Sequence, residues 1–164
     1  MKKILIGLLI IGGLIGLMIW AKQGQAKLPT QETQDVKSVL TTDKTLYDFG
    51  EISMANGKVT TIFKVSNNSG SDVILESVTT SCMCTNAYLV NGEEKKGPYG
   101  MPGHGGPVMK ANKIIKTGET QDVEVVYDPN AHGPAGVGPV DRFVFLQDKN
   151  GGIIQLEVKA VVRP

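Results

Sequence analysis

The stretch KVTTIFKVSN, residues 58–67, decides the fold class of this chain. Apolar or β-branched side chains occupy every second position, namely Val59, Thr61, Phe63 and Val65. Strict alternation of this kind is typical of a β-strand with one buried face. The run NNSGSD at 67–72 follows directly and is rich in residues that favour turns. The segment therefore predicts a strand that ends in a turn.

The same pattern recurs later in the chain. Residues 122–127 (DVEVVY) alternate again, and the β-branched run at 73–80 predicts a further strand after the first turn. Residues 142–147 are followed by the turn sequence DKNGG at 148–152 and then by a second apolar run at 153–162. Two such runs joined by a glycine-containing turn predict a β-hairpin.

After position 35, no window of eleven or more residues has a convincing helical period. Twenty glycines and eight prolines in 164 residues suit a turn-rich β protein better than a helical bundle. Several short strands separated by turn signals predict an all-β sandwich or barrel, and the chain from residue 36 onward is long enough to enclose one core. We expect that core to contain Phe63, Val65, Val125, Phe143 and Phe145.

Charge and composition exclude several classes of protein. Seventeen basic residues balance sixteen acidic ones, which argues against a nucleic-acid binder, because such a protein carries a basic stripe. A hydrophobic content of 41% with 20% charged residues is typical of a globular chain. Two cysteines are too few for a disulfide scaffold or a four-cysteine zinc site.

The N-terminus predicts export from the cytoplasm. Two lysines precede an uncharged apolar run, residues 4–20, which would span roughly 26 Å as a helix. A charged start before an apolar run is typical of a signal peptide, and Gly24-Gln25-Ala26 resembles a cleavage site. The run is also nearly as long as a bilayer core of about 30 Å, so a retained transmembrane anchor stays open. In both cases the positive-inside bias places the remainder in an extracytoplasmic location, secreted or membrane-anchored.

These signals divide the chain into three regions. Residues 1–26 form a signal peptide or transmembrane anchor that meets the membrane through 4–20, residues 27–35 form a linker, and residues 36–164 form the β domain. Residues 91–118 hold seven glycines and three prolines, and they predict a long Gly-rich insertion in that domain.

Cys82 and Cys84 are the candidate chemical site. In a strand, residues i and i+2 point to one face, and their Cα atoms would lie about 6.6 Å apart. That is near the upper limit of about 6.8 Å for a disulfide, whereas two adjacent sulfurs suit a soft metal such as copper(I) or zinc. His104 in the insertion is the candidate further metal ligand. Other available ligands are Met101, Met109 and His132.

Three roles stay open for the cysteine pair: structural thiols or a disulfide, a soft-metal site, and a thiol-redox centre. The Cys-x-x-Cys motif of thioredoxin-like proteins is absent from the sequence. The sequence also lacks Ser, His and Asp in the order of a hydrolase catalytic triad, and it lacks the H-E-x-x-H motif of zinc proteases. It therefore predicts that the protein is not an enzyme. His132 follows Pro129 and precedes Pro134, and we expect it to be a turn residue.

Several segments together resemble a known bacterial family of unknown function. They are Tyr47-Asp48-Phe49-Gly50-Glu51-Ile52, the strand end Phe63-Lys64-Val65-Ser66-Asn67, the motif Ser81-Cys82-Met83-Cys84-Thr85, Thr117-Gly118-Glu119 and the strand end at 125–129. The resemblance covers roughly residues 43–162. It implies an exported immunoglobulin-like domain, distantly similar to the Hydin-type domains of cilia. Met83 stands where the family usually has glycine, and the Gly-rich insertion replaces a usually short connection.

The combined expectation is an immunoglobulin-like β-sandwich behind an N-terminal signal or anchor helix. We expect a non-enzymatic, exported and membrane-tethered module that acts through contact with a protein partner. Soft-metal binding at Cys82 and Cys84, with copper(I) as the leading metal and zinc as the other, is one alternative. Thiol-redox chemistry at the same pair is the second alternative.

Overall fold

The computed structural model describes residues 37–103 and 110–164, which belong to one compact unit, Asp35–Pro164. The predicted signal or anchor segment and His104 lie outside the described residues. Among the residues that are described, no helix is long and apolar enough to cross a membrane. The described part is built from strands, with two short 3₁₀ turns at Met54–Asn56 and Gly133–Gly136, which confirms the all-β prediction.

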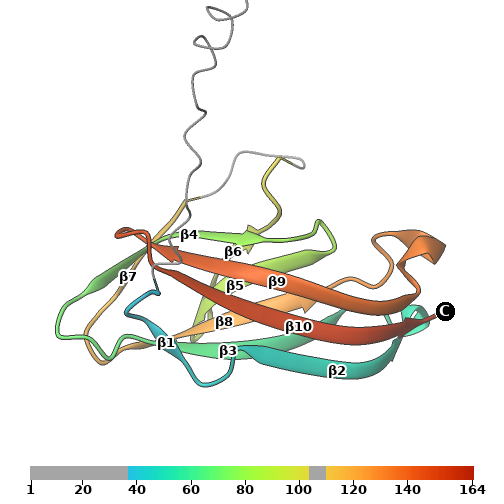
Figure 1. The fold of residues 1–164 in the computed structure, drawn as a ribbon, viewed down its shortest axis with the longest axis horizontal. Coiled ribbons are helices and arrows are strands. Elements are labelled where there is room, and N and C mark those ends of the chain that lie inside the picture. The colour runs from blue at the N-terminus through green and yellow to red at the C-terminus, as the bar shows by residue number, and fades with distance from the viewer. Residues whose placement is uncertain (1–36, 104–109) are drawn as a thin grey trace, which may run out of the picture. The chain divides into compact units, whose positions relative to one another are not determined.

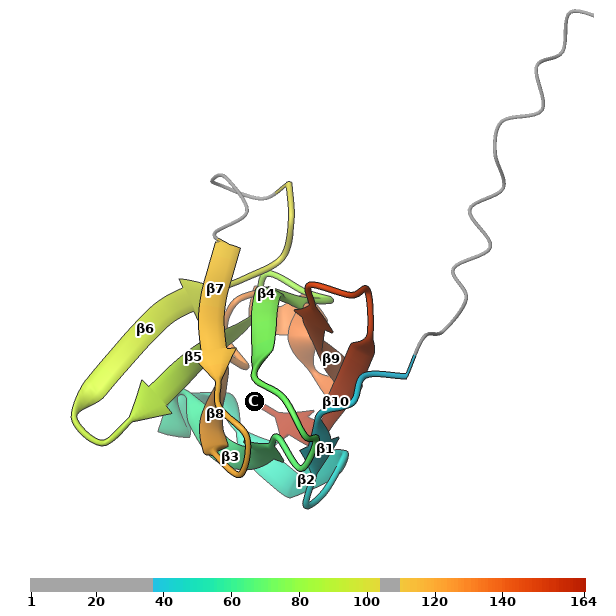
Figure 2. The ribbon, with the colours of Figure 1, turned by 90° about the vertical axis from the view of Figure 1, so that its left-hand side faces the viewer.

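Two five-stranded sheets pack face to face in a sandwich (Figures 1 and 2). The strands are β1 (Thr41–Thr42), β2 (Leu46–Ser53), β3 (Val59–Ser66), β4 (Val73–Thr80), β5 (Thr85–Asn91), β6 (Glu94–Tyr99), β7 (Lys110–Ile115), β8 (Thr120–Tyr127), β9 (Gly138–Asp148) and β10 (Ile153–Arg163). One sheet has the order β1-β3-β8-β5-β6 and the other the order β2-β10-β9-β4-β7. All neighbours are antiparallel except β2 and β10, which are parallel.

The alternating stretches form the centre of the first sheet. Strand β3 pairs with β8 so that Phe63 lies opposite Val123, and both side chains are fully buried. Val65 on β3 and Val125 on β8 are buried on the same face, since successive side chains of a strand point to opposite sides. The core positions predicted for these two strands are therefore confirmed.

The closing hairpin is also confirmed, but the residues predicted to face the core from its first strand are wrong. Strands β9 and β10 pair across the turn at 148–152, as expected. Val144 and Leu146 fill the core, whereas Phe143 and Phe145 are only half-buried and lie near each other, with ring centroids 6.4 Å apart. Residues 143–146 are apolar on both faces, so the period of two does not tell which face is inside.

The predicted Gly-rich insertion at 91–118 is wrong as a single loop, because it contains two strands. Strand β6 pairs with β5, and strand β7 pairs with β4 at the edge of the other sheet. Gly97 sits where β6 passes closely over β5: an added Cβ would lie 2.8 Å from the Tyr88 ring and 2.9 Å from the carbonyl oxygen of Ala87. The glycine here therefore permits strand pairing and does not mark a loop.

Asn67 holds together the turns at one end of the sandwich, and we expect Asn67→Ala to lower the free energy of unfolding by about 2 kcal/mol. Its buried side chain donates to the carbonyl oxygens of Ser71 and Ile115, at 2.9 and 2.8 Å, and accepts from the amide of Ser69 at 3.0 Å. Alanine would remove all three hydrogen bonds. Chemical denaturation would measure the change.

The matched control is Asn68→Ala. Asn68 is exposed and donates one hydrogen bond, to the Thr41 hydroxyl at 2.9 Å. We expect this change to stay within about 0.5 kcal/mol. Equal losses in the two variants would contradict the role assigned to Asn67.

Candidate redox and metal-binding site

Cys82 and Cys84 lie on the turn that links β4 in one sheet to β5 in the other, and they form a disulfide with each other. The strand geometry expected for them is wrong. The turn shortens the distance between their Cα atoms to 5.2 Å, which is within the usual range for a disulfide. The carbonyl oxygen of Cys82 accepts hydrogen bonds from the Thr85 amide at 3.1 Å and the Thr80 hydroxyl at 3.0 Å, which hold the turn.

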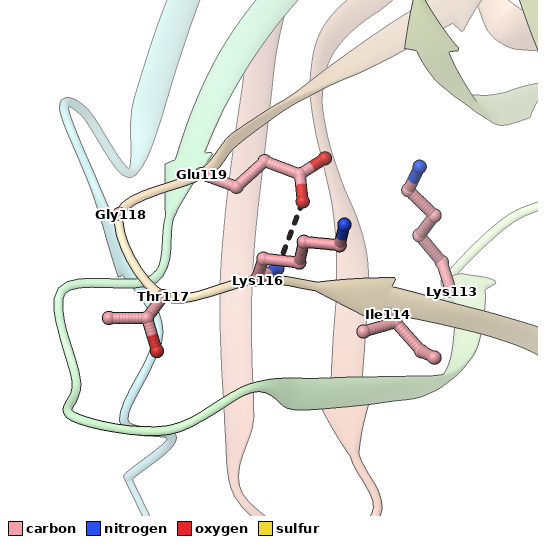
Figure 3. A pocket seen from close by; sticks show the side chains of 6 residues that line it. All are labelled: Lys113, Ile114, Lys116, Thr117, Gly118 and Glu119. Carbon is pink, nitrogen blue, oxygen red and sulfur yellow. Dashed lines mark hydrogen bonds between the residues drawn. The ribbon is translucent and has the colours of Figure 1, made fainter.

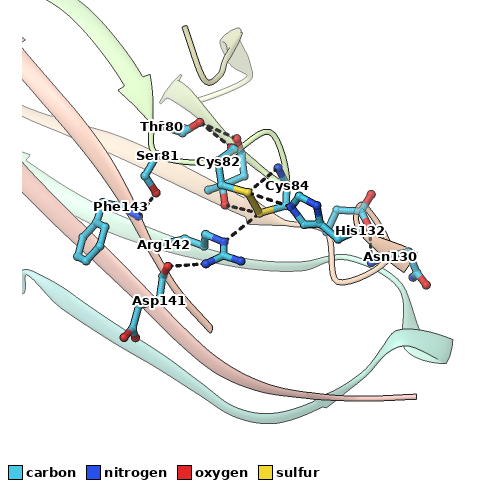
Figure 4. Close-up of a disulfide and its surroundings, with 11 residues drawn as sticks. Thr80, Ser81, Cys82, Cys84, Asn130, His132, Asp141, Arg142 and Phe143 are labelled. Atoms are coloured by element: carbon cyan, nitrogen blue, oxygen red, sulfur yellow. Dashed lines mark hydrogen bonds between the residues drawn. A yellow bond between two sulfur atoms is a disulfide. The ribbon is translucent and has the colours of Figure 1, made fainter. Parts of the chain in front are cut away.

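His132, which we expected to be a turn residue and counted among the other available ligands, contacts the disulfide. Its Nε2 lies 3.2 Å from Cys82 Sγ (Figure 4). The turn that carries His132 follows β8 and is fixed to the cysteine turn by the Asp128 amide, which donates to the carbonyl oxygen of Cys84 at 2.8 Å. Within the same turn, the Asn130 amide donates to the Asp128 carboxylate at 2.9 Å. His132 is therefore positioned by backbone contacts next to the half-buried sulfur.

Arg142 on β9 contacts the other sulfur and carries the positive charge of the site. Its Nε donates to Cys84 Sγ at 3.1 Å, and its Nη1 donates to the carbonyl oxygen of Asp141 at 2.7 Å. Strand β9 is held against the cysteine turn by Ser81 and Phe143, whose groups exchange two hydrogen bonds of 2.9 Å each (Figure 4). The sequence offered no signal for Arg142, because the contact depends on how β4 and β9 pair.

Exposure differs sharply between the two sulfur-bearing residues. Cys84 is 1% exposed and packs with Tyr127 and Val162 in a small apolar cluster, while Cys82 is half-buried and His132 is exposed. Burial raises the pKa of the Tyr127 hydroxyl, and the positive charge of Arg142 opposes that shift. The charge of Arg142 therefore reaches the buried groups around Cys84, whereas Cys82 is accessible to solvent.

The sulfur atoms of both cysteines and a ring nitrogen of His132 all lie within 4.8 Å of one another. Of the site residues named from the sequence, the structure brings together Cys82, Cys84 and His132, and it adds Arg142. His104 and Met109 lie outside the described residues, so their expected role as ligands stays a prediction. The arrangement offers two chemistries: exchange of a disulfide flanked by two nitrogen groups, and soft-metal ligation once the disulfide is open.

Apart from the cysteine site, a surface pocket lies at the turn between β7 and β8 (Figure 3). It is lined by Lys113, Ile114, Lys116, Thr117, Gly118 and Glu119. The amide of Lys116 donates to the Glu119 carboxylate at 2.9 Å, and the amide of Gly118 donates to the carbonyl oxygen of Asn67 at 2.7 Å. These groups complete the turn itself, so the pocket offers no comparable set of reactive groups.

Part of the chain matches a described protein family. The profile of the family described as "Protein of unknown function (DUF1573)" matches residues 40–100, a range that includes both cysteines. This match supports the resemblance to a family of unknown function. No curated protein matches the chain.

Solved structures show similarity in fold. A protein of unknown function from Porphyromonas gingivalis W83 is similar over 82% of this chain and 51% of its own length, with a TM-score of 0.55 and 15% identity. The secreted serine protease VesC from Vibrio cholerae is similar over 79% of this chain and 24% of its own length, with a TM-score of 0.48 and 15% identity. This chain thus spans about half of the first protein and about a quarter of the second.

Proposed function

We propose that this chain is an exported immunoglobulin-like module that exchanges disulfides with a protein partner through Cys82 and Cys84. The observation that supports it best is the pair of nitrogen contacts on the bridge: Arg142 Nε at 3.1 Å from Cys84 Sγ and His132 Nε2 at 3.2 Å from Cys82 Sγ. The proposal joins the expected partner-binding role to the thiol-redox alternative. It keeps residues 4–20 as a signal or membrane anchor.

A disulfide between residues this close in sequence contributes little to stability, which argues against a purely structural role. A disulfide stabilises a fold mainly by restricting the unfolded chain, and the effect grows with the length of the closed loop. Cys82 and Cys84 are separated by two positions, and a three-residue loop is worth about 1.6 kcal/mol, against about 3 kcal/mol for a 15-residue loop. The bridge also joins no distant segments of the chain.

The different exposure of the sulfurs assigns their roles. Cys82 is the more exposed of the two cysteines, so a thiolate of the partner attacks its sulfur and forms a mixed disulfide. The Cys82–Cys84 bond breaks, and Cys84 leaves as a thiolate beside the Arg142 guanidinium, which favours the anionic form. A second thiolate of the partner then attacks the partner's sulfur in the mixed disulfide. This releases the Cys82 thiolate and leaves the partner with a disulfide between its own two sulfurs. The module gains two electrons and two protons, and the partner dithiol loses the same.

In the reverse direction, the reduced module opens a disulfide of its partner. The Cys82 thiolate attacks first, and the Cys84 thiolate then displaces the partner from Cys82 and closes the original bridge. His132 lies within hydrogen-bond distance of Cys82 and can take its proton before the attack. The same residues therefore serve both directions, and the partner's redox state decides which one runs.

Two single-cysteine variants of the full-length chain test the proposal. Cys84→Ser keeps the half-exposed Cys82, and Cys82→Ser keeps the buried Cys84, so each variant is the control of the other. We expect Cys82 to form a mixed disulfide with oxidised glutathione at least about tenfold faster, as measured by mass spectrometry of quenched samples. Far-ultraviolet circular dichroism establishes that both variants are folded.

Two outcomes would overturn the proposal. One is faster reaction of Cys84 than of Cys82 in the folded variants. The other is a wild-type bridge that stays closed in excess dithiothreitol for as long as the domain remains folded, which would make the bridge structural.

A further inference from the structure

We propose that the opened Cys82–Cys84 pair, together with His132, binds one copper(I) ion. The inference rests on the proposed function in one respect, namely that the disulfide opens while the domain stays folded. It replaces the ligand set expected from the sequence, in which His104 was the histidine, with one assembled entirely from described residues.

The distances between the ligand atoms suit a single ion. An ion about 2.3 Å from sulfur and about 2.0 Å from nitrogen needs ligand atoms about 3.5–4.0 Å apart. Cys82 Sγ and His132 Nε2 are 3.2 Å apart, and the three ligand atoms lie within 4.8 Å of one another. Two pairs are closer than required: the two sulfurs, because they are bonded, and Cys82 Sγ with His132 Nε2, by about 0.3 Å. Reduction breaks the bond between the two sulfurs, so they are free to move apart.

The chemistry of the ligands selects the metal. Thiolates favour copper(I) and zinc over hard cations such as calcium and magnesium. Zinc usually takes four ligands, whereas the described residues of the group supply two sulfurs and one nitrogen. Two soft thiolates and one imidazole match a low-coordinate copper(I) ion.

The charge of Arg142 favours the same choice. Two thiolates and a neutral imidazole around copper(I) carry a net charge of −1, which the guanidinium beside Cys84 Sγ balances. The same ligands around zinc(II) are neutral, which leaves the partly buried guanidinium without a counter-charge at the centre. Arg142 would thus contact a copper-bound sulfur without binding the ion itself.

Binding is coupled to the redox state of the pair. The disulfide takes up two electrons and two protons from a thiol reductant, and copper(I) then replaces the two thiol protons. The oxidised module has no thiolate to offer, so it should not bind. The fold thus provides a site that holds copper(I) under reducing conditions and releases it as the bridge closes, when a disulfide oxidant accepts the two electrons.

An anaerobic titration of the full-length chain tests the inference. The protein is reduced with a phosphine, freed of the reductant and titrated with copper(I) against a coloured chelator. We expect one ion per reduced chain and none per oxidised chain. We expect His132→Ala to weaken binding at least about tenfold, and X-ray absorption to show the loss of one nitrogen neighbour in that variant.

His104→Ala is the matched control, because it removes the other histidine of the chain. A loss of affinity in His132→Ala that His104→Ala does not show supports the inference, whereas an equal loss in both variants overturns the assigned ligand set. Unchanged affinity in His132→Ala, binding by the oxidised chain, or a preference for zinc over copper(I) overturns it. A bridge that reduces and exchanges with glutathione but binds no copper(I) removes this inference and leaves the proposed function intact. A bridge that cannot be reduced in the folded protein removes both.

Discussion

Phe63→Ala is expected to lower the free energy of unfolding by about 3–5 kcal/mol. Phe63 is 0% exposed at the centre of β3 and lies opposite Val123 of β8, in the core between the two sheets. Alanine would remove the whole ring from the core and leave a cavity that neighbouring β-branched side chains are too stiff to fill. Such a loss approaches the whole stability of many domains, so urea denaturation at low temperature is the suitable measurement.

Phe143→Ala is the matched control for this prediction. It removes the same atoms from a half-buried ring on the outer side of β9, where solvent can occupy the space that the ring leaves. We expect a loss of less than about 2 kcal/mol. Losses of the same size in both variants would mean that the outer aromatic pair is as important as the core.

Arg142→Met is expected to lower the thiolate population of Cys84 at neutral pH by about tenfold or more in the reduced protein. Arg142 Nε donates to Cys84 Sγ at 3.1 Å, and Cys84 is 1% exposed, so little water can replace the guanidinium. A buried thiolate without its counter-charge is strongly disfavoured. In a Cys82→Ser background, where Cys84 is the single thiol, the ultraviolet absorbance of the thiolate, followed as a function of pH, measures this population.

Arg163→Met is the control for Arg142→Met, because it changes the net charge equally. Arg163 pairs with the Glu51 carboxylate at 2.9 Å on the exposed surface, and an exposed charge acts weakly through solvent. We expect its thiolate titration in the same background to match that of Cys82→Ser alone. A curve for Arg142→Met that coincides with that of Arg163→Met would show that the guanidinium does not act on the sulfur.

Local sequence was sufficient for the strands whose two faces differ in polarity. In β3 and β8 the buried face is mainly apolar or β-branched and the other face mainly polar, so the period of two identified both the strand and its buried face. Residues 143–146 of β9 lack that difference, and there the choice between the two faces went wrong. The core position depends on the opposite sheet, which the local pattern does not contain.

The segment at 91–118 shows that local sequence also fails to reveal which strands pair. Its glycines and prolines indicated a loop, yet β6 and β7 are held as edge strands by hydrogen bonds to β5 and β4. Gly97 is there because the Tyr88 side chain passes too close for a Cβ. A glycine required by close packing and a glycine in a loop look identical in a sequence.

The sequence by itself determined the all-β class, the closing hairpin and the two cysteines as the candidate site. Only the tertiary structure decided which residues contact them. Pairing of Thr85 with Tyr127 brings the His132 turn beside the cysteine turn, and pairing of Thr80 with Val144 brings Arg142 to Cys84. His132 is 50 positions from Cys82, and Arg142 is 58 positions from Cys84. Register between distant strands is set by the packing of the whole core, so no local pattern around either residue carries it.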